Sequence, residues 1–144
     1  MVLYAKDIVE KDFVSMPRET NALAAARTMR DRRHGYVVVV ALGGQPEGIV
    51  TEWDYLSKIV AEGRDASTMR LADLMSANLV SVSADDGIER VAEVMTQQGI
   101  RRVLVVKDGK VLGIIEAKQI LARLKDYVDR ISVQIARAQT PMFG

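Results

Sequence analysis

The chain has 144 residues, 49% of them hydrophobic, which suits one domain able to bury about two thirds of its unfolded surface. Its formal net charge of +1 argues against a general basic surface, so no nucleic-acid partner is expected. The absence of cysteine excludes disulfides, thiolate catalysis and zinc–thiolate sites. Because no apolar stretch approaches the roughly 18 residues of a membrane span and the N-terminus lacks an export signal, we expect a cytoplasmic protein that does not bind membranes.

The first part of the chain predicts a short helical turn, a short strand, a helix, a strand hairpin and a second helix. Thr20 and Asn21 offer side-chain oxygens that can cap a helix over residues 22–32. A β-rich apolar run, a glycine-rich turn, a second apolar run and a helical pattern follow at residues 36–42, 43–46, 48–50 and 52–61. Strands that are almost continuously apolar indicate sheets covered by helices, so the pattern favours an α/β or α+β fold.

The same order of elements then occurs a second time. A shift of 66 positions matches residues 6–56 with residues 72–121, with a one-residue gap between the two strands of the hairpin. The clearest matches pair the apolar run 37–40 with 103–106 and the segment 48–50 with 113–115. Two units that each leave an apolar face uncovered are expected to bury these faces against each other, which predicts one compact module with internal pseudo-two-fold symmetry.

The repeat sets the predicted domain organisation. We expect a first repeat over residues 1–62, a connector over 63–70, a second repeat over 71–122 and a C-terminal helical extension over 123–144. An apolar stripe with alternating spacings of three and four residues runs into the extension and has no counterpart in the first repeat, so it must pack on this domain or on another chain. Its members are Leu121, Leu124, Val128, Ile131 and Ile135.

The sharpest local signal is the pair Thr51 and Asp54, which follows a strand and opens a helix. The spacing is close to that of a helix capping box, so a purely structural interpretation comes first. The second copy has Glu116 and Gln119 at the equivalent positions, which indicates that the duplicated fold does not need the pair. The Asp54 carboxylate can accept hydrogen bonds from a vicinal diol such as ribose, and Thr51 with the free amides of the helix start suits a phosphate or ribose oxygen.

These residues together resemble the CBS-domain pair, also called the Bateman module, a regulatory unit of many enzymes and transporters that also occurs as a free-standing protein. The resemblance covers nearly the whole chain. It rests on the repeated element order, on the matched segments 33–40 and 99–106, and on the Gly-x-x-Thr-x-x-Asp pattern of residues 48–54. It implies tandem repeats of the order β-α-β-β-α and binding of an adenosine-containing ligand in a cleft between them; we expect the free-standing form.

The resemblance also implies site residues. It places Asp54 on the ribose hydroxyls and Thr51 near the ribose or a phosphate. The wall for the adenine corresponds to Val9, Val14, Ser15, Met16, Gly35 and Tyr36 of the first copy. Phosphates of a ligand held by one copy are commonly met by basic groups of the other, which correspond to Arg101, Arg102 and Lys118. Without the motif, these three cations read equally well as solvated surface residues.

The second copy departs from the family pattern. Gln119 stands in place of the ribose aspartate and Glu116 in place of the threonine, which puts a negative charge where a phosphate would lie. We therefore expect the second site to be empty or altered, and one tightly bound nucleotide per chain. Because arginine presents a fork that matches phosphate oxygens, a phosphorylated ligand is favoured over free adenosine.

The predicted function is a regulatory module that senses AMP, ADP or ATP and passes a conformational change to a partner. The alternatives are an S-adenosylmethionine-type binder and a non-binding dimerisation scaffold. No nucleophile and partner base stand at a recognisable spacing, and there is no phosphate-binding P-loop, so we assign no catalytic residue, metal ligand or cofactor. Members of the family usually pair into flat dimers, so we expect a homodimer, and an unidentified effector protein is expected to receive the output.

Overall fold

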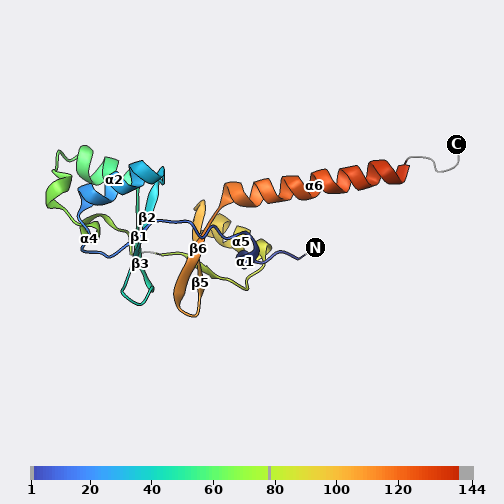
Figure 1. The fold of residues 1–144 in the computed structure, drawn as a ribbon, viewed down its shortest axis with the longest axis horizontal. Helices are drawn as coiled ribbons and strands as arrows, with labels where there is room; N and C mark the ends of the chain where they lie inside the picture. The colour runs from blue at the N-terminus through green and yellow to red at the C-terminus, as the bar shows by residue number, and fades with distance from the viewer. Residues whose placement is uncertain (1, 78, 140–144) are drawn as a thin grey trace.

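The computed structural model describes residues 2–77 and 79–139. It shows two α/β halves side by side, with one long helix leaving the second half (Figure 1). The elements in chain order are α1 (Ala5–Ile8), β1 (Ser15–Met16), α2 (Ala22–Arg32), β2 (Tyr36–Val40), β3 (Pro46–Thr51), α3 (Glu52–Tyr55), a π-helical turn (Leu56–Val60), a 3-10 turn (Ala66–Thr68), α4 (Leu71–Leu74), β4 (Ser81–Ser83), α5 (Ile88–Gln98), β5 (Arg102–Lys107), β6 (Lys110–Glu116) and α6 (Ala117–Gln139).

Each half contains a three-stranded sheet of the same topology. The strand orders are β1-β2-β3 and β4-β5-β6, and in each sheet the first pair is parallel and the second antiparallel. The registers agree as well, because Tyr36 faces Thr51 and Arg102 faces Glu116 at the equivalent step. This confirms the predicted duplication and the mixed α/β fold class.

The structure contains the helix cap and the hairpin turn that the sequence indicates. Asn21 caps α2, because its Oδ1 accepts hydrogen bonds from the backbone N–H groups of Leu23 and Ala24 at 3.0 and 3.1 Å. Asp108 and Gly109 connect β5 to β6 with φ angles of 53° and 75°. Such positive values at both central residues match the right-handed twist of a two-residue hairpin.

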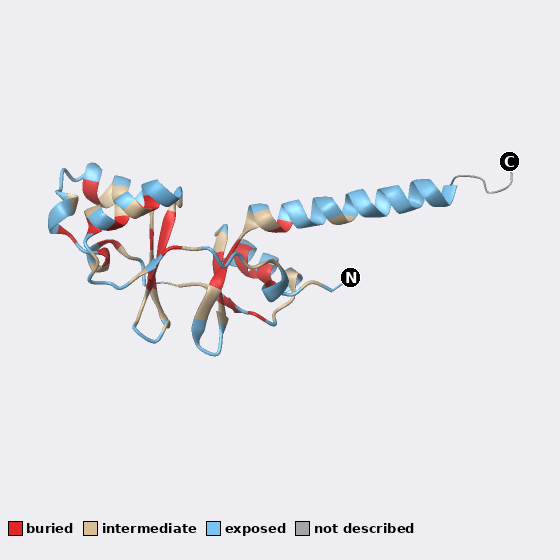
Figure 2. Ribbon diagram, in the orientation of Figure 1, coloured by how far each residue is buried: buried red, intermediate tan, exposed pale blue. Residues whose placement is uncertain are grey.

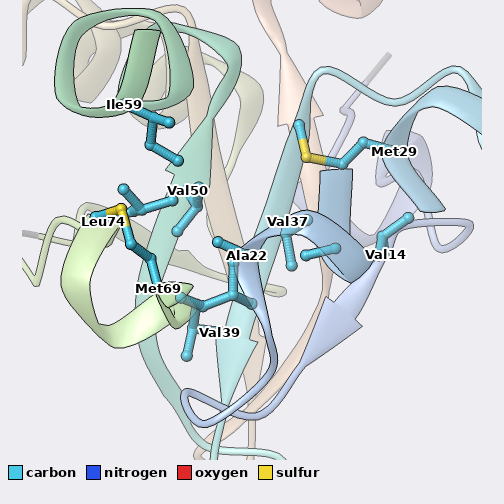
Figure 3. Close-up of a cluster of buried hydrophobic side chains, with 11 residues drawn as sticks. Val14, Ala22, Met29, Val37, Val39, Val50, Ile59, Met69 and Leu74 are labelled. Atoms are coloured by element: carbon cyan, nitrogen blue, oxygen red, sulfur yellow. The ribbon is translucent and has the colours of Figure 1, made fainter. Parts of the chain in front are cut away.

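The short helix at the start of each copy packs on the core of the other copy. Leu74 of α4 is fully buried in the core around α2, β2 and β3 (Figure 3), whereas Ala5 of α1 belongs to the core of the second half. Backbone hydrogen bonds hold this exchange, since Glu10 N–H donates to the Ile114 carbonyl at 2.8 Å and Ser76 N–H donates to the Ile49 carbonyl at 3.0 Å. The two copies are therefore interlocked, and neither half has a complete core without a segment of the other.

A third apolar cluster joins the two sheets. Its buried members are Tyr36 and Val38 of β2, Leu104 of β5 and Ile114 of β6. Val38 and Leu104 are equivalent residues, 66 positions apart, so the contact is close to symmetric. Figure 2 shows buried residues concentrated along the strands of both halves. The shared apolar face expected from the repeat is thus present between the sheets.

The last helix differs from its equivalent in the first copy. α6 continues without a break from Ala117 to Gln139, so the expected extension is a continuation of the closing helix of the second copy and does not begin a new element. Residues 140–144 of that predicted extension lie outside the described residues. Across residues 2–77 and 79–139, no helix combines the length and the apolar character needed to cross a membrane.

Candidate functional site

Asp54 lies at the start of α3 with 9% of its surface exposed, and its carboxylate is already engaged. Its Oδ2 accepts hydrogen bonds from the Thr51 backbone N–H at 2.8 Å and from the Thr51 hydroxyl at 3.3 Å. Its Oδ1 forms an ion pair with Lys58 Nζ at 3.0 Å, and Lys58 also donates to the Leu74 carbonyl at 2.7 Å. The capping interpretation is therefore realised, and a ribose would have to share this carboxylate with protein donors.

The second copy makes the equivalent cap with a neutral side chain. The backbone N–H of Glu116 donates to Gln119 Oε1 at 2.8 Å. The second copy thus folds without the Thr51–Asp54 pair, and an amide oxygen takes the capping place of the carboxylate. What distinguishes the two copies here is the charge of the cap.

A cavity of about 560 Å³ opens between the two copies beside the start of α6. It is lined by Ile49, Thr51, Gly99, Ile100, Arg101, Arg102, Glu116, Ala117 and Lys118. A narrower pocket of about 110 Å³ shares three of these residues and is mostly apolar. Its lining is Ile49, Leu79, Val80, Ile100, Arg102, Leu104 and Ile114. Ile49 and Thr51 lie two residues apart on β3, on the same face of the strand, so they connect the apolar pocket to the charged opening.

The structure brings several of the predicted site residues together in this cleft, which we define as the space lined by the residues of these two cavities. Thr51 of the first copy and Arg101, Arg102 and Lys118 of the second line the larger cavity. Gly35 lines a neighbouring opening of about 570 Å³ together with Thr51, Arg101 and Arg102. Thr51 rather than Asp54 is the member of the predicted pair that lines both openings.

Other predicted residues lie elsewhere. Val14 is 2% exposed in the core of the first half, where Met16 packs beside it, and Ser15 between them is exposed. Val9 was expected beside these three residues, but it packs against the core of the second half because the chain ahead of β1 crosses over. A Cβ atom on Gly113 would lie 2.6 Å from Val9 Cγ2, which shows how closely this segment approaches β6.

Tyr36 is buried at the contact between the two sheets. Its side chain is 4% exposed, and the guanidinium of Arg102 lies 5.0 Å from the centroid of its ring. Burial raises the pKa of Tyr36 to about 12, with a further increase from the charge of Glu116 and an opposing effect of Arg102. The phenol is therefore neutral at physiological pH. We expected the wall for the adenine in the first copy. The apolar pocket is lined instead by Val80 and Arg102 of the second copy, which are the equivalents of Val14 and Tyr36.

Glu116 organises the cations of the cleft. Its carboxylate pairs with Arg102 Nε at 3.6 Å and with Lys118 Nζ at 3.4 Å. Among the described residues, Arg101 has no ion pair and is exposed. Two of the three cations expected to meet phosphate are therefore partly neutralised from within the site. The register pointed to this contact, because Arg102 faces Glu116 across β5 and β6.

Sequence analysis missed Leu79, Val80 and Ile100 as lining residues. They are the equivalents of Phe13, Val14 and His34 at the 66-residue shift. Applying the family pattern to the second copy would have found Val80, the equivalent of Val14, but not Leu79 or Ile100, because Phe13 and His34 are not among the residues that the resemblance implies.

Comparison with known proteins agrees with this architecture. The family model described as CBS domain matches residues 5–61 and 71–126. An uncharacterized protein of Methanopyrus kandleri is 31% identical over 116 residues, which cover 80% of this chain and 59% of that protein. The chain therefore spans less than two thirds of the length of this relative.

Two solved structures are similar over most of the chain. A hexameric CBS-CP12 protein from bloom-forming cyanobacteria has a TM-score of 0.74 and 32% sequence identity, covering 84% of this chain and 67% of that one. A CBS domain protein from Pyrobaculum aerophilum, solved in complex with AMP, has a TM-score of 0.72 and 24% identity, covering 81% of this chain and 89% of that one. The second likeness shows the fold alone.

Proposed function

The chain belongs to the CBS-domain family, and on that premise we propose that it is a regulatory module that binds an adenine nucleotide in the cleft between its two copies. The observation that carries the proposal is that Thr51 of one copy and Arg101, Arg102 and Lys118 of the other line a single cavity of about 560 Å³. That volume lies within the roughly 300–1,000 Å³ of small-molecule sites. The AMP complex of the Pyrobaculum aerophilum protein, which has the same fold, supports an adenosine ligand.

We propose that the ligand lies along β3. The base enters the apolar pocket at Ile49 and Ile100. The ribose lies near Thr51, with Asp54 behind it, and the phosphates face Arg101 and the two cations that Glu116 holds. An apolar surface for the base and charge-assisted bonds for the phosphates are the contacts that such a ligand requires.

Regulation follows from the place where the ligand would bind. A nucleotide that contacts both copies favours the relative tilt of the copies that it binds most tightly. Glu116, Ala117 and Lys118 line the cavity and lead directly into α6, so a change in the cleft reaches the helix that leaves the body. We propose that the change passes to a second copy in a homodimer and to a separate effector protein, with no chemical step in this chain.

The first test is a ligand panel measured by thermal shift and isothermal titration calorimetry. Adenosine, AMP, ADP, ATP and S-adenosylmethionine are compared on the full chain. We expect AMP, ADP or ATP to bind with one site per chain and to stabilise the folded state by about 2.7 kcal/mol at a hundredfold excess over the dissociation constant. Two equivalent AMP sites would contradict the single-site proposal. Selective binding of S-adenosylmethionine would favour that alternative, and no response to any compound would favour a scaffold.

Replacing Glu116 by threonine, the residue of the first copy, is expected to tighten binding of the phosphorylated ligands. The substitution removes a negative charge and releases Arg102 and Lys118 from their ion pairs. Because Lys118 is 80% exposed at its side chain, water screens the effect and the gain is about threefold to tenfold. Calorimetry with AMP or ATP measures it.

Adenosine serves as the matched ligand control for this substitution. It lacks phosphate, so its affinity should be the same for the native chain and for Glu116→Thr. Glu116→Gln removes the charge with little change of shape and should reproduce the gain. An equal gain for adenosine and AMP would show that Glu116 acts on the shape of the cleft instead of its charge.

A further inference from the structure

The helix α6 extends well beyond the body of the molecule (Figures 1 and 2). It has 23 residues, and among the described residues of this helix only Ile120, near its start, is buried. Residues 128–139 are all exposed. In the first copy the equivalent helix ends with the π-helical turn at Val60, so the outer part of α6 has no internal counterpart. Residues 128–139 thus pack on no part of the domain that the structure describes.

Five aliphatic side chains form a stripe along α6. Their spacing alternates between three and four residues, which is the a/d pattern of a heptad repeat. Leu121, Leu124, Val128, Ile131 and Ile135 are 67%, 46%, 57%, 39% and 53% exposed. Single exposed aliphatic residues need no explanation, but a continuous row of five marks an interaction surface. We call this surface the α6 stripe.

The polar residues of α6 are arranged so that the stripe can meet a copy of itself. The ion pair between Lys125 and Asp129, at 3.0 Å, and the arginines that recur every seven residues lie away from the a and d positions. In a parallel pair aligned in register, Tyr127 of one copy would face Ser132 of the other, and Gln134 would face Gln139. No like charges meet at these flanking positions.

We propose that the α6 stripe pairs with the α6 stripe of a second copy in a parallel, two-stranded coiled coil. The exposed outer part of the helix, residues 128–139, is short enough to be marginal as a helix in water without a partner. A second copy presents the same apolar period, which knobs-into-holes packing requires. Val128 and Ile135 at a positions with Leu124 at a d position favour two parallel strands, whereas Leu121 at a with Ile131 at d is the combination of higher oligomers, so the sedimentation measurement below tests the number of strands. Val128, Ile131 and Ile135 have no equivalent in the first copy, whose helical segment ends at Val60, and the pairing does not depend on the proposed nucleotide binding.

The absence of cysteine from the native chain allows a direct test. Ile135→Cys places a thiol on the stripe, and Val133→Cys places one on the opposite side of the same turn. Val133 is a matched control, because it is aliphatic and 49% exposed against 53% for Ile135. Under mild oxidation of the full chain, we expect Ile135→Cys to form disulfide-linked dimers at least about tenfold faster than Val133→Cys. Equal rates, or no dimers of Ile135→Cys, would overturn the proposal.

The direction of pairing is tested in the same way. Leu124→Cys should also link to itself, because equal positions meet in a parallel pair. If Leu124→Cys and Ile135→Cys link only to each other when mixed, the helices run antiparallel and the parallel proposal is wrong. Mass spectrometry of the linked peptides distinguishes the two results.

Self-association provides a second, independent measurement. The double variant Ile131→Asp, Ile135→Asp should weaken dimerisation of the full chain by at least about tenfold in sedimentation equilibrium, while Val133→Asp leaves it unchanged. Both should keep the melting temperature of the body, since these side chains are exposed in the single chain. A native chain that stays monomeric at the highest concentration reached, or a double variant that associates as tightly as the native chain, would contradict the α6 pairing.

Discussion

Replacing Asp54 by alanine is expected to weaken binding of AMP or ATP by about tenfold to a hundredfold. It is also expected to lower the free energy of unfolding by about 1 to 2 kcal/mol without ligand, because the Thr51 N–H loses its capping acceptor and Lys58 loses its ion pair. Thr51 lines the cleft, and its hydroxyl donates a hydrogen bond to the Asp54 carboxylate. The substitution therefore removes a charged acceptor for the ribose and also the hydrogen bond that orients the Thr51 hydroxyl. Calorimetry measures the first effect and urea denaturation the second.

Asp54→Asn separates the two effects. An asparagine oxygen can keep the cap, as the neutral Gln119 does in the second copy, so stability should fall by less than in the alanine variant. The charged acceptor is lost in both variants, so nucleotide affinity should fall in both. If the asparagine variant binds AMP as tightly as the native chain, the ribose does not use this carboxylate. The ribose would then have to lie nearer to Gln119.

Replacing Leu74 by alanine is expected to lower the free energy of unfolding by about 2 to 5 kcal/mol. Leu74 is completely buried, and it belongs to the second copy by sequence while it fills the core of the first half (Figure 3). Because α4 joins the two halves, the substitution should shift a single cooperative transition of the whole body. Denaturation followed by far-UV circular dichroism and by tryptophan fluorescence measures both the size and the coincidence of the transition.

Leu42→Ala is the matched control for that substitution. It removes the same atoms from a leucine that is fully exposed and lies outside the α6 stripe and the cleft, so the chain should lose less than about 0.5 kcal/mol. Circular dichroism and the fluorescence of Trp53, which belongs to the first half, should report the same midpoint for Leu74→Ala. Two separated transitions, with the second half unaffected, would show that the exchanged helices do not couple the copies.

The exchange of α1 and α4 also marks the limit of the sequence-based domain assignment. The duplication, the order of helices and strands along the chain and the cap at Asn21 were predicted from spacing and local chemistry, and the structure confirms them. The repeat boundaries at 62, 70 and 122 stay predictions, because a repeat of sequence is compatible with either copy supplying the first helix of a core. The sequence of an apolar helical turn of four residues does not show on which sheet the turn will pack.

The candidate site shows the same division. The cations Arg101, Arg102 and Lys118 and the hydroxyl of Thr51 were placed on one cleft by resemblance to a family, and they do line one cavity. Their electrostatic state was not predicted, because it depends on Glu116 contacting Arg102 across two strands and Lys118 along the helix. The sequence also did not show which copy lines the apolar pocket. That depends on whether Tyr36 turns into the interface between the sheets.

By itself, the sequence determined that two similar units would fold, that each would form a hairpin between helices, and that a long apolar stripe would remain at the C-terminal end. These features follow from period, turn residues and capping, which act over a few neighbouring positions. Only the tertiary structure decided which copy fills which core, where space remains between the sheets, and that α6 leaves the body exposed. Those outcomes depend on close packing between segments far apart in the chain, such as the contact between the sheets in which the ring of Tyr36 is buried.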